Sequence, residues 1–96
     1  MIWQVRTYKI RPGHMDDFLA LWKNWVVPTR EDLGYVVRGG WYDADDDVFV
    51  WIVGHEAPDG WEAAEAAYYA HPRRDEFPHQ PREFVADVQT RLMREA

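Results

Sequence analysis

Side chains suited to acid–base chemistry and anion binding recur at every second position in several stretches of this sequence. Arg6 and Tyr8 stand two residues apart in one stretch, and His55 ends another. Side chains of an extended chain alternate between two faces, so residues of equal parity share a face. With the stretches aligned as strands, one face is expected to collect Gln4, Arg6, Tyr8, Arg38, Phe49, Trp51, His55, Asp87, Gln89 and Arg91.

This set resembles the lining of a small-molecule pocket, in which aromatic walls surround a few convergent polar groups. Two arginines could hold a carboxylate, a phenolate or an enolate, and an imidazole titrates near neutrality and can move a proton. We therefore assign catalytic roles to His55, Arg6 and Tyr8. The expected substrate-binding residues are Arg38, Phe49, Trp51, Asp87, Gln89 and Arg91.

Each of these residues also has a structural interpretation. Arg6 could pair with Asp87 across the sheet, and a buried ion pair need not have a function. His55, at the end of a strand beside Glu56, could be a solvent-facing or capped histidine. Phe49 and Trp51 could belong to a hydrophobic core between two copies of the chain instead of a substrate wall.

Hydrophobic periodicity predicts six elements that would position these residues. Apolar residues at intervals of three and four indicate helices, and strict alternation indicates strands. The predicted strands are Ile2–Ile10, Tyr35–Tyr42, Val48–His55 and Phe84–Met93, with a short helix as the competing interpretation of the last. The predicted helices run from His14 to Glu31 and from about Ala57 to Ala70.

The order βαββαβ predicts a single α+β domain over residues 1–96 with a ferredoxin-like fold. Its four-stranded antiparallel sheet would carry both helices on one face, which we expect to bear Val5, Val50 and Val88. The other face would be left open. Because strand 48–55 is apolar on both sides, we expect a second copy of the chain to cover that face.

Composition excludes several classes of function. A formal charge of −6 argues against a nucleic-acid partner, which normally meets a basic patch. The chain has no cysteine, so it has no thiolate nucleophile and no cysteine metal site. Metal ligands could also come from His71, Asp75, Glu76 and His79, but their loop contains prolines instead of a helix that would fix the ligand spacing, so we expect no metal. No apolar run approaches the ~20 residues of a membrane span, and the first residues lack a signal-peptide pattern. We expect a soluble, cytoplasmic protein with no membrane partner.

Four phrases of the sequence resemble the NIPSNAP family: residues 5–13, Gly39-Gly40-Trp41, residues 50–55 and residues 87–93. The most distinctive is R-T-Y-x-x-x-P-G, which runs from Arg6 to Gly13. The sequence departs from the family at His55, where tyrosine is common, and at His71, where an acidic residue often precedes the proline. The family belongs to the dimeric α+β barrel superfamily, together with antibiotic-biosynthesis and heme-degrading monooxygenases.

The resemblance implies a homodimer and leaves two classes of function. One is a cofactor-independent monooxygenase or a cyclase or isomerase that binds an aromatic or polyketide-like molecule. The other is a non-catalytic dimeric module for ligand binding or stress response. No flavin or nicotinamide fingerprint is present, so no cofactor is expected. Heme is not expected either, because Trp61 and His71, which flank the second helix as in heme-degrading relatives, would lie on different helix faces.

Overall fold

The computed structural model describes all 96 residues and contains the predicted order of strands and helices. Two of the predicted strands are confirmed residue for residue, and the other elements differ at their ends by one to four residues. The strands are β1 (Ile2–Ile10), β2 (Val36–Asp43), β3 (Val48–His55) and β4 (Val85–Arg94). The helices are α1 (Met15–Leu21), a π-helical turn (Trp22–Val26), α2 (Val27–Asp32), α3 (Trp61–Tyr69) and two 3₁₀ turns (Pro72–Glu76 and Pro81–Glu83).

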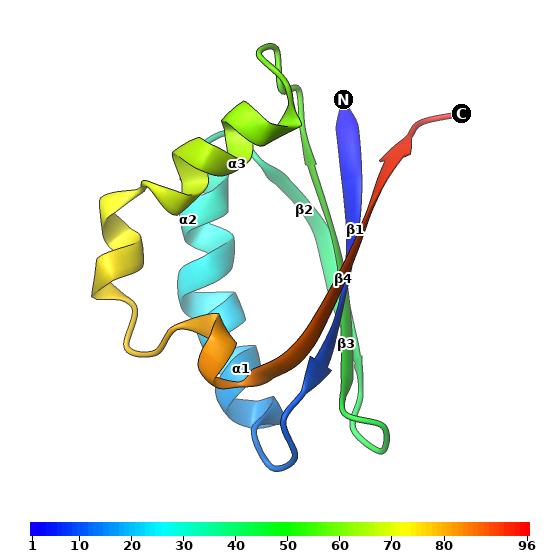
Figure 1. Cartoon of the computed structure of the whole chain (residues 1–96), viewed down its shortest axis with the longest axis vertical. Helices are drawn as coiled ribbons and strands as arrows, with labels where there is room; N and C mark the ends of the chain where they lie inside the picture. The colour runs from blue at the N-terminus through cyan, green and yellow to red at the C-terminus, as the bar shows by residue number, and fades with distance from the viewer.

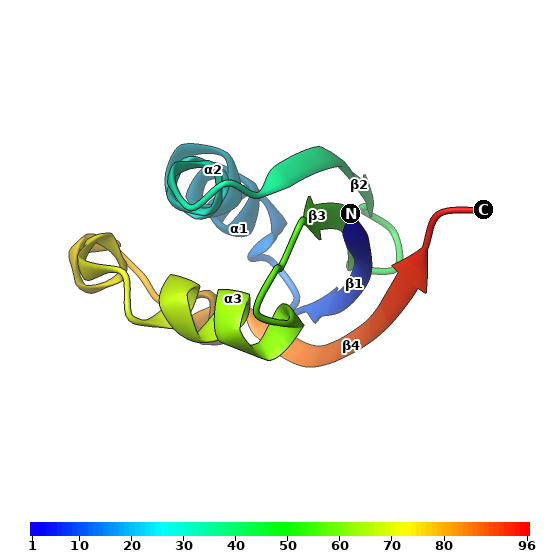
Figure 2. The ribbon, with the colours of Figure 1, turned by 90° about the horizontal axis from the view of Figure 1, so that it is seen from above.

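The four strands form one antiparallel sheet in the order β2-β3-β1-β4. Figure 1 shows the helices on one side of this sheet and the two chain termini at the same end of it. In Figure 2 the sheet curls, and α1, α2 and α3 lie on the same side of it. The arrangement confirms the ferredoxin-like α+β class. None of the helices has the length and the hydrophobicity that a membrane-spanning helix needs.

The first helix is continuous from α1 to α2 but widens in the middle. Its π-helical turn ends two residues before Pro28, which has no N–H and whose ring crowds the carbonyl four residues earlier. A π turn shifts the side chains that follow it around the helix axis, and such turns are frequent at functional sites. The helix therefore continues past the proline, and Arg30 is buried within it.

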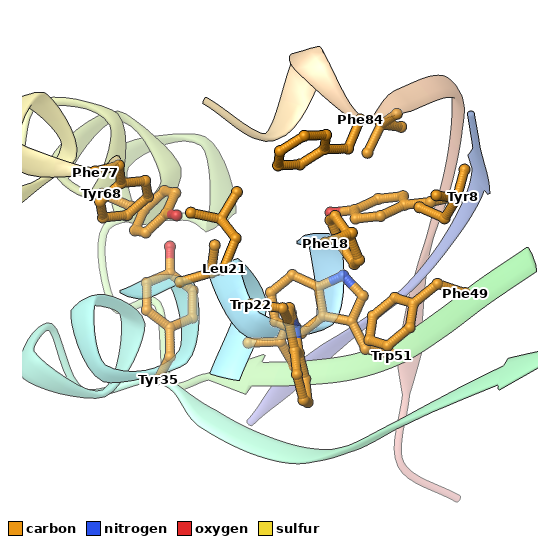
Figure 3. Close-up of a cluster of buried hydrophobic side chains, with 14 of the residues drawn as sticks. Tyr8, Phe18, Leu21, Trp22, Tyr35, Phe49, Trp51, Tyr68, Phe77 and Phe84 are labelled. Carbon is orange, nitrogen blue, oxygen red and sulfur yellow. The ribbon is translucent and has the colours of Figure 1, made fainter. Parts of the chain in front are cut away.

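The core is a cluster of aromatic rings between the sheet and the first helix (Figure 3). Phe49 on β3 meets Phe18 with ring centroids 5.0 Å apart and Trp22 with centroids 5.1 Å apart, both edge to face. Trp22 also meets Trp51, at 5.8 Å. Such contacts add about 0.5–1.5 kcal/mol per pair beyond area burial. The aromatic rings of β3 therefore hold the helix onto the sheet.

Two glycines let rings lie directly on the strands. A Cβ on Gly40 of β2 would stand 2.6 Å from Cζ of Phe49 and 2.8 Å from Cη2 of Trp22. A Cβ on Gly54 of β3 would stand 2.5 Å from Cε3 of Trp3, on the other side of the sheet. The absence of a side chain at these positions is thus a packing requirement on each face.

The helices cover the opposite sheet face from the one predicted. They lie on the face that bears Arg6, Tyr8 and Trp51, whereas the face of Val5 and Val50 points away from them. Alternation establishes which residues share a face but not which face is covered. The aromatic side chains are larger than the valines, so covering their face buries more apolar surface.

The register of β4 corrects a second expectation. Asp87, Gln89 and Arg91 pair with odd-numbered residues of β1, so they lie on the outer face, away from the helices. Arg6 is opposite Thr90, and its predicted pairing with Asp87 is wrong. A β-bulge next to Ile10 sets this register, and the pattern of alternation within one strand does not reveal it.

Arg38 also lies on the outer face. Its predicted place was beside Arg6, but a bulge between Val37 and Gly39 turns it to the other side. There its guanidinium carbon stands 4.9 Å from the ring centre of Trp3. This distance suits a cation–π contact, which gives Arg38 a structural role on that face.

Candidate ligand-binding site

A cavity of 240 Å³ lies between the inner face of the sheet and the helices. Its wall is mostly aromatic and aliphatic, and its charged groups are all arginines. Its outer end reaches the surface, since Tyr69 and Val88 are 53% and 48% exposed. The lining residues are Arg6, Tyr8, Phe18, Trp22, Val26, Arg30, Trp51, Tyr68, Tyr69, Arg74, Gln80, Pro81, Arg82, Val85 and Val88.

Arg6 projects from β1 into this region and is held by three neighbours. Its Nε donates to the hydroxyl of Tyr8 at 2.7 Å, and its Nη1 donates to Oε1 of Gln4 at 2.7 Å. Nη1 also stands 3.5 Å from a carboxylate oxygen of Glu65. Burial opposes the charge on the guanidinium, but Tyr8, Tyr69 and Glu65 together raise the pKa of Arg6. Arg6 is therefore a fixed positive charge in the cavity wall.

The hydroxyl of Tyr8 is oriented by Arg6. Its oxygen accepts the hydrogen bond from Nε of Arg6, and the structure shows no acceptor for its own hydrogen. A buried hydroxyl normally finds such an acceptor. The hydrogen of Tyr8 is thus available to an oxygen atom of a bound molecule.

A buried ionic network joins α2 to α3 behind this pair. Nη1 of Arg30 donates to Oε2 of Glu65, and the hydroxyl of Tyr35 donates to the same oxygen at 2.5 Å. Figure 3 shows the hydroxyl groups of Tyr35 and Tyr68 pointing toward each other at this place. Burial and the carboxylate raise the pKa of Tyr35, so it remains a neutral donor. Glu65 thereby binds two arginines and a tyrosine.

The sequence pattern did not lead us to Arg30 or Glu65, although a signal for Arg30 was present. Arg30 follows Val26 by four residues and Trp22 by eight, on the apolar stripe of the first helix. A charged residue on such a stripe must be buried with a partner. Its partner lies 35 residues away in the chain, a distance that helical periodicity does not bridge.

The ring of Tyr68 contacts two arginines at the helix side of the cavity. The guanidinium carbon of Arg30 lies 3.8 Å from the ring centre of Tyr68, and that of Arg74 lies 5.0 Å from the same centre. Burial raises the pKa of Tyr68, despite the two nearby positive charges. Tyr68 therefore holds both guanidinium groups with a neutral ring.

The structure places His55 outside the cavity. Its Nδ1 accepts the N–H of Ala57 at 2.8 Å, which leaves Nε2 to donate to the carbonyl of Leu33, also at 2.8 Å. Ala57 has a left-handed backbone with φ of 45°, which the histidine contact helps to hold. Both ring nitrogens are thus used to fix the turn between β3 and α3.

Of the ten residues expected on one face, the structure brings only some together. Arg6, Tyr8 and Trp51 line the cavity, Gln4 supports Arg6, and Phe49 packs behind the wall. The outer face instead carries Arg38, Asp87, Gln89 and Arg91. The structure contains no cluster of three or more His, Asp or Glu side chains that could hold a metal ion.

Comparison with known proteins agrees with this architecture. The NIPSNAP family model matches residues 3–96. A NIPSNAP domain protein from Burkholderia xenovorans superposes with a TM-score of 0.83 at 17% identity, over 100% of this chain and 95% of that one. A NIPSNAP family protein from Agrobacterium tumefaciens gives a TM-score of 0.83 at 20% identity, over 100% of this chain and 88% of that one.

A more distant structure extends the same fold. A crystal structure described as an antibiotic biosynthesis monooxygenase superposes with a TM-score of 0.74 at 20% identity, over 100% of this chain and 99% of that one. No protein of curated function matches the sequence. These structural likenesses establish the fold, and the family model spans nearly the whole sequence. The chain therefore belongs to the NIPSNAP family.

Proposed function

We propose that this protein binds a small aromatic molecule in the cavity between its sheet and its helices. The observation that carries the proposal is the Arg6–Tyr8 pair, in which an oriented hydroxyl with a free hydrogen stands in an aromatic wall. Flat rings of a ligand would pack against Trp22 and Trp51, while an oxygen substituent would accept from Tyr8. Binding of this kind would complete the hydrogen bonding of the cavity.

The same pair supports a chemical step on the bound molecule. Tyr8 can exchange a proton with a phenolic or enolic oxygen, and Arg6 would stabilise negative charge on that oxygen of the ligand. The name of the monooxygenase with the same fold makes oxygenation the reaction to examine. We propose that an electron-rich phenol reacts with dioxygen at a ring carbon that bears hydrogen. One oxygen atom forms a new carbonyl, and the other leaves as water with two hydrogens of the phenol, so no cofactor is consumed.

Calorimetric titration with 1-naphthol tests the binding proposal. We expect saturable binding with one ligand per chain, weakened about tenfold by Tyr8→Phe because one hydrogen bond of roughly 1.4 kcal/mol is lost. Tyr42→Phe is the control, since Tyr42 is exposed and does not line the cavity. Absence of saturable binding to the wild-type protein would overturn the proposal.

Oxygen uptake by the same complex separates the enzyme from the binding module. Oxygenation of 1-naphthol would give 1,4-naphthoquinone and water, with one dioxygen consumed per quinone formed. We expect this stoichiometry with the wild-type protein and its loss in Tyr8→Phe. Saturable binding without oxygen uptake would instead favour the non-catalytic ligand-binding module.

We also propose that the outer sheet face pairs with a second copy of the chain. Val5, Val50 and Ile52 form an apolar centre there, and Trp41 is 56% exposed beside them. Large exposed apolar groups on one face mark interaction surfaces. A domain of this size also has little core of its own, which favours pairing.

A further inference from the structure

We propose that the cavity selects an organic anion built on one or two fused rings. This inference rests on the proposed binding function and adds to it the charge and the size of the ligand. The charge follows from the side chains that line the wall, and the size follows from the volume that they enclose. A neutral aromatic molecule of equal shape would bind more weakly.

The wall of the cavity carries an excess of positive charge. Arg6, Arg30, Arg74 and Arg82 line it, and no aspartate or glutamate does. The only carboxylate that pairs with these arginines is Glu65, which contacts Arg6 and Arg30. Four guanidinium charges thus face one carboxylate, in a chain whose formal net charge is −6. The cavity wall is therefore positively charged although the protein as a whole is negatively charged. Local positive charge of this kind favours an anionic ligand.

Unpartnered hydrogen-bond donors in the same wall point to the same class of ligand. Nε1 of Trp22, Nε1 of Trp51 and Nε of Arg30 are buried and have no acceptor. All three residues line the cavity, and Arg30 and Trp51 are each 1% exposed. Indole and guanidinium groups donate only, so they cannot satisfy one another. A carboxylate or phenolate oxygen of a ligand that reached these donors would be a strong acceptor for them.

Arg74 lines the outer part of the cavity. Its guanidinium group has no carboxylate partner and can bind an anion. Its guanidinium carbon lies 4.7 Å from the ring centre of Tyr69 and 5.6 Å from that of Phe77. Its Nη2 donates to Oε1 of Gln80 at 3.2 Å, and it has no carboxylate partner. The neighbouring Arg73 is different, because it pairs with Asp32 and does not line the cavity. The two adjacent arginines therefore form a matched test and control.

The volume limits the ligand to one or two rings. An apolar cavity of about 150 Å³ binds benzene, and sites for drug-sized molecules begin at about 300 Å³. The cavity here measures 240 Å³, between these two values. A single substituted ring or a fused pair fits this space, whereas a third fused ring would have to project into solvent.

Calorimetry with charged and neutral ligands of equal shape tests the charge. The probes are 2-naphthoate and 2-naphthamide, which differ by a carboxylate in place of a primary amide. We expect the carboxylate to bind at least tenfold more tightly, with an affinity that falls as salt is added. Arg74→Gln should weaken 2-naphthoate about tenfold and leave 2-naphthamide within twofold, and Arg73→Gln should change neither by more than twofold.

Other results of these titrations would overturn the ligand charge, the ligand size or the proposed function, each separately. Equal binding of the two naphthalene probes would overturn this inference and leave the proposed aromatic site standing. Equal effects of Arg73→Gln and Arg74→Gln would also overturn it, because only a general loss of positive charge would then matter. Failure of both probes and of 1-naphthol to bind would overturn the proposed function itself. Tighter binding of anthracene-9-carboxylate than of 2-naphthoate would overturn the limit on size.

Discussion

Arg6 and Tyr8 act as one unit, and their roles differ. Tyr8 presents a free hydroxyl hydrogen to the cavity, while Arg6 fixes the position of the hydroxyl oxygen. Glu65 keeps Arg6 and Arg30 together behind them. The positive charge of the cavity is therefore partly balanced from behind by one carboxylate.

We expect the single substitution Glu65→Gln to destabilise the protein by about 3 kcal/mol, because two buried guanidinium charges would lose their only carboxylate partner. Urea unfolding measures the change. Glu62→Gln, on the exposed side of the same helix, is the control and should stay within about 0.5 kcal/mol of wild type. Equal stability of the two variants would show that the network is not a structural clamp.

The sequence could reveal Arg6 and Tyr8 as a pair but not the network that holds them. Their spacing of two within a strand places both on one face, and the structure agrees. Glu65 is one of several glutamates on an alanine-rich helix, and nothing in its spacing marks it as buried. His55 shows the opposite case, since its residue type suggested catalysis and its contacts assign it to a turn.

Among the elements, strands β2 and β3 carry the aromatic packing of both sheet faces. Gly40 allows Phe49 and Trp22 to approach β2 from the cavity side, and Gly54 allows Trp3 to lie on β3 from the outer side. The two glycines thus serve the same purpose on opposite faces.

We expect Gly40→Ala and Gly54→Ala each to destabilise the protein by about 1–3 kcal/mol, because the new methyl group overlaps a ring in both cases. Thermal unfolding measures this loss. Only Gly40→Ala should also weaken ligand binding, since Phe49 and Trp22 shape the cavity. Weakened binding in Gly54→Ala, with none in Gly40→Ala, would place the ligand on the outer face.

Element order was predictable, and most element ends were predictable to within one residue, because periodicity is a local property. The covered face was not, because alternation shows which residues share a face, and the choice between two apolar faces depends on how much surface each one buries against the helices. The bulge at Arg38 reversed the expected side of that residue. The bulge next to Ile10 reversed the expected side of three residues on β4. Such errors come from register, which alternation within a single strand does not determine.

On the scale of the whole molecule, the helices cover one face of the sheet and leave the other face, with its apolar centre, uncovered. Two copies that meet through Trp41, Val50 and Ile52 would bury that face without closing the cavity, which lies on the helix side. The dimer and the ligand site would then be independent of each other.

We expect Val50→Glu to convert a wild-type dimer into a monomer, because a carboxylate at the centre of an apolar interface cannot be solvated. Light scattering coupled to size exclusion measures the mass. Glu56→Gln, a charge change at an exposed position beyond β3, is the control. A monomeric wild-type protein, or a Val50→Glu variant that stays dimeric, would contradict pairing through this face.

The most direct test of the ligand site uses the indole N–H signals of the six tryptophans in a ¹H–¹⁵N spectrum. Each signal can be assigned by a single Trp→Phe substitution. Saturation with 2-naphthoate should move the signals of Trp22 and Trp51, whose N–H groups are buried without acceptors in residues that line the cavity. The signals of Trp41 and Trp3 on the outer face should stay in place. Binding that moves Trp41 or Trp3 and leaves Trp22 and Trp51 unchanged would contradict a ligand site between the sheet and the helices.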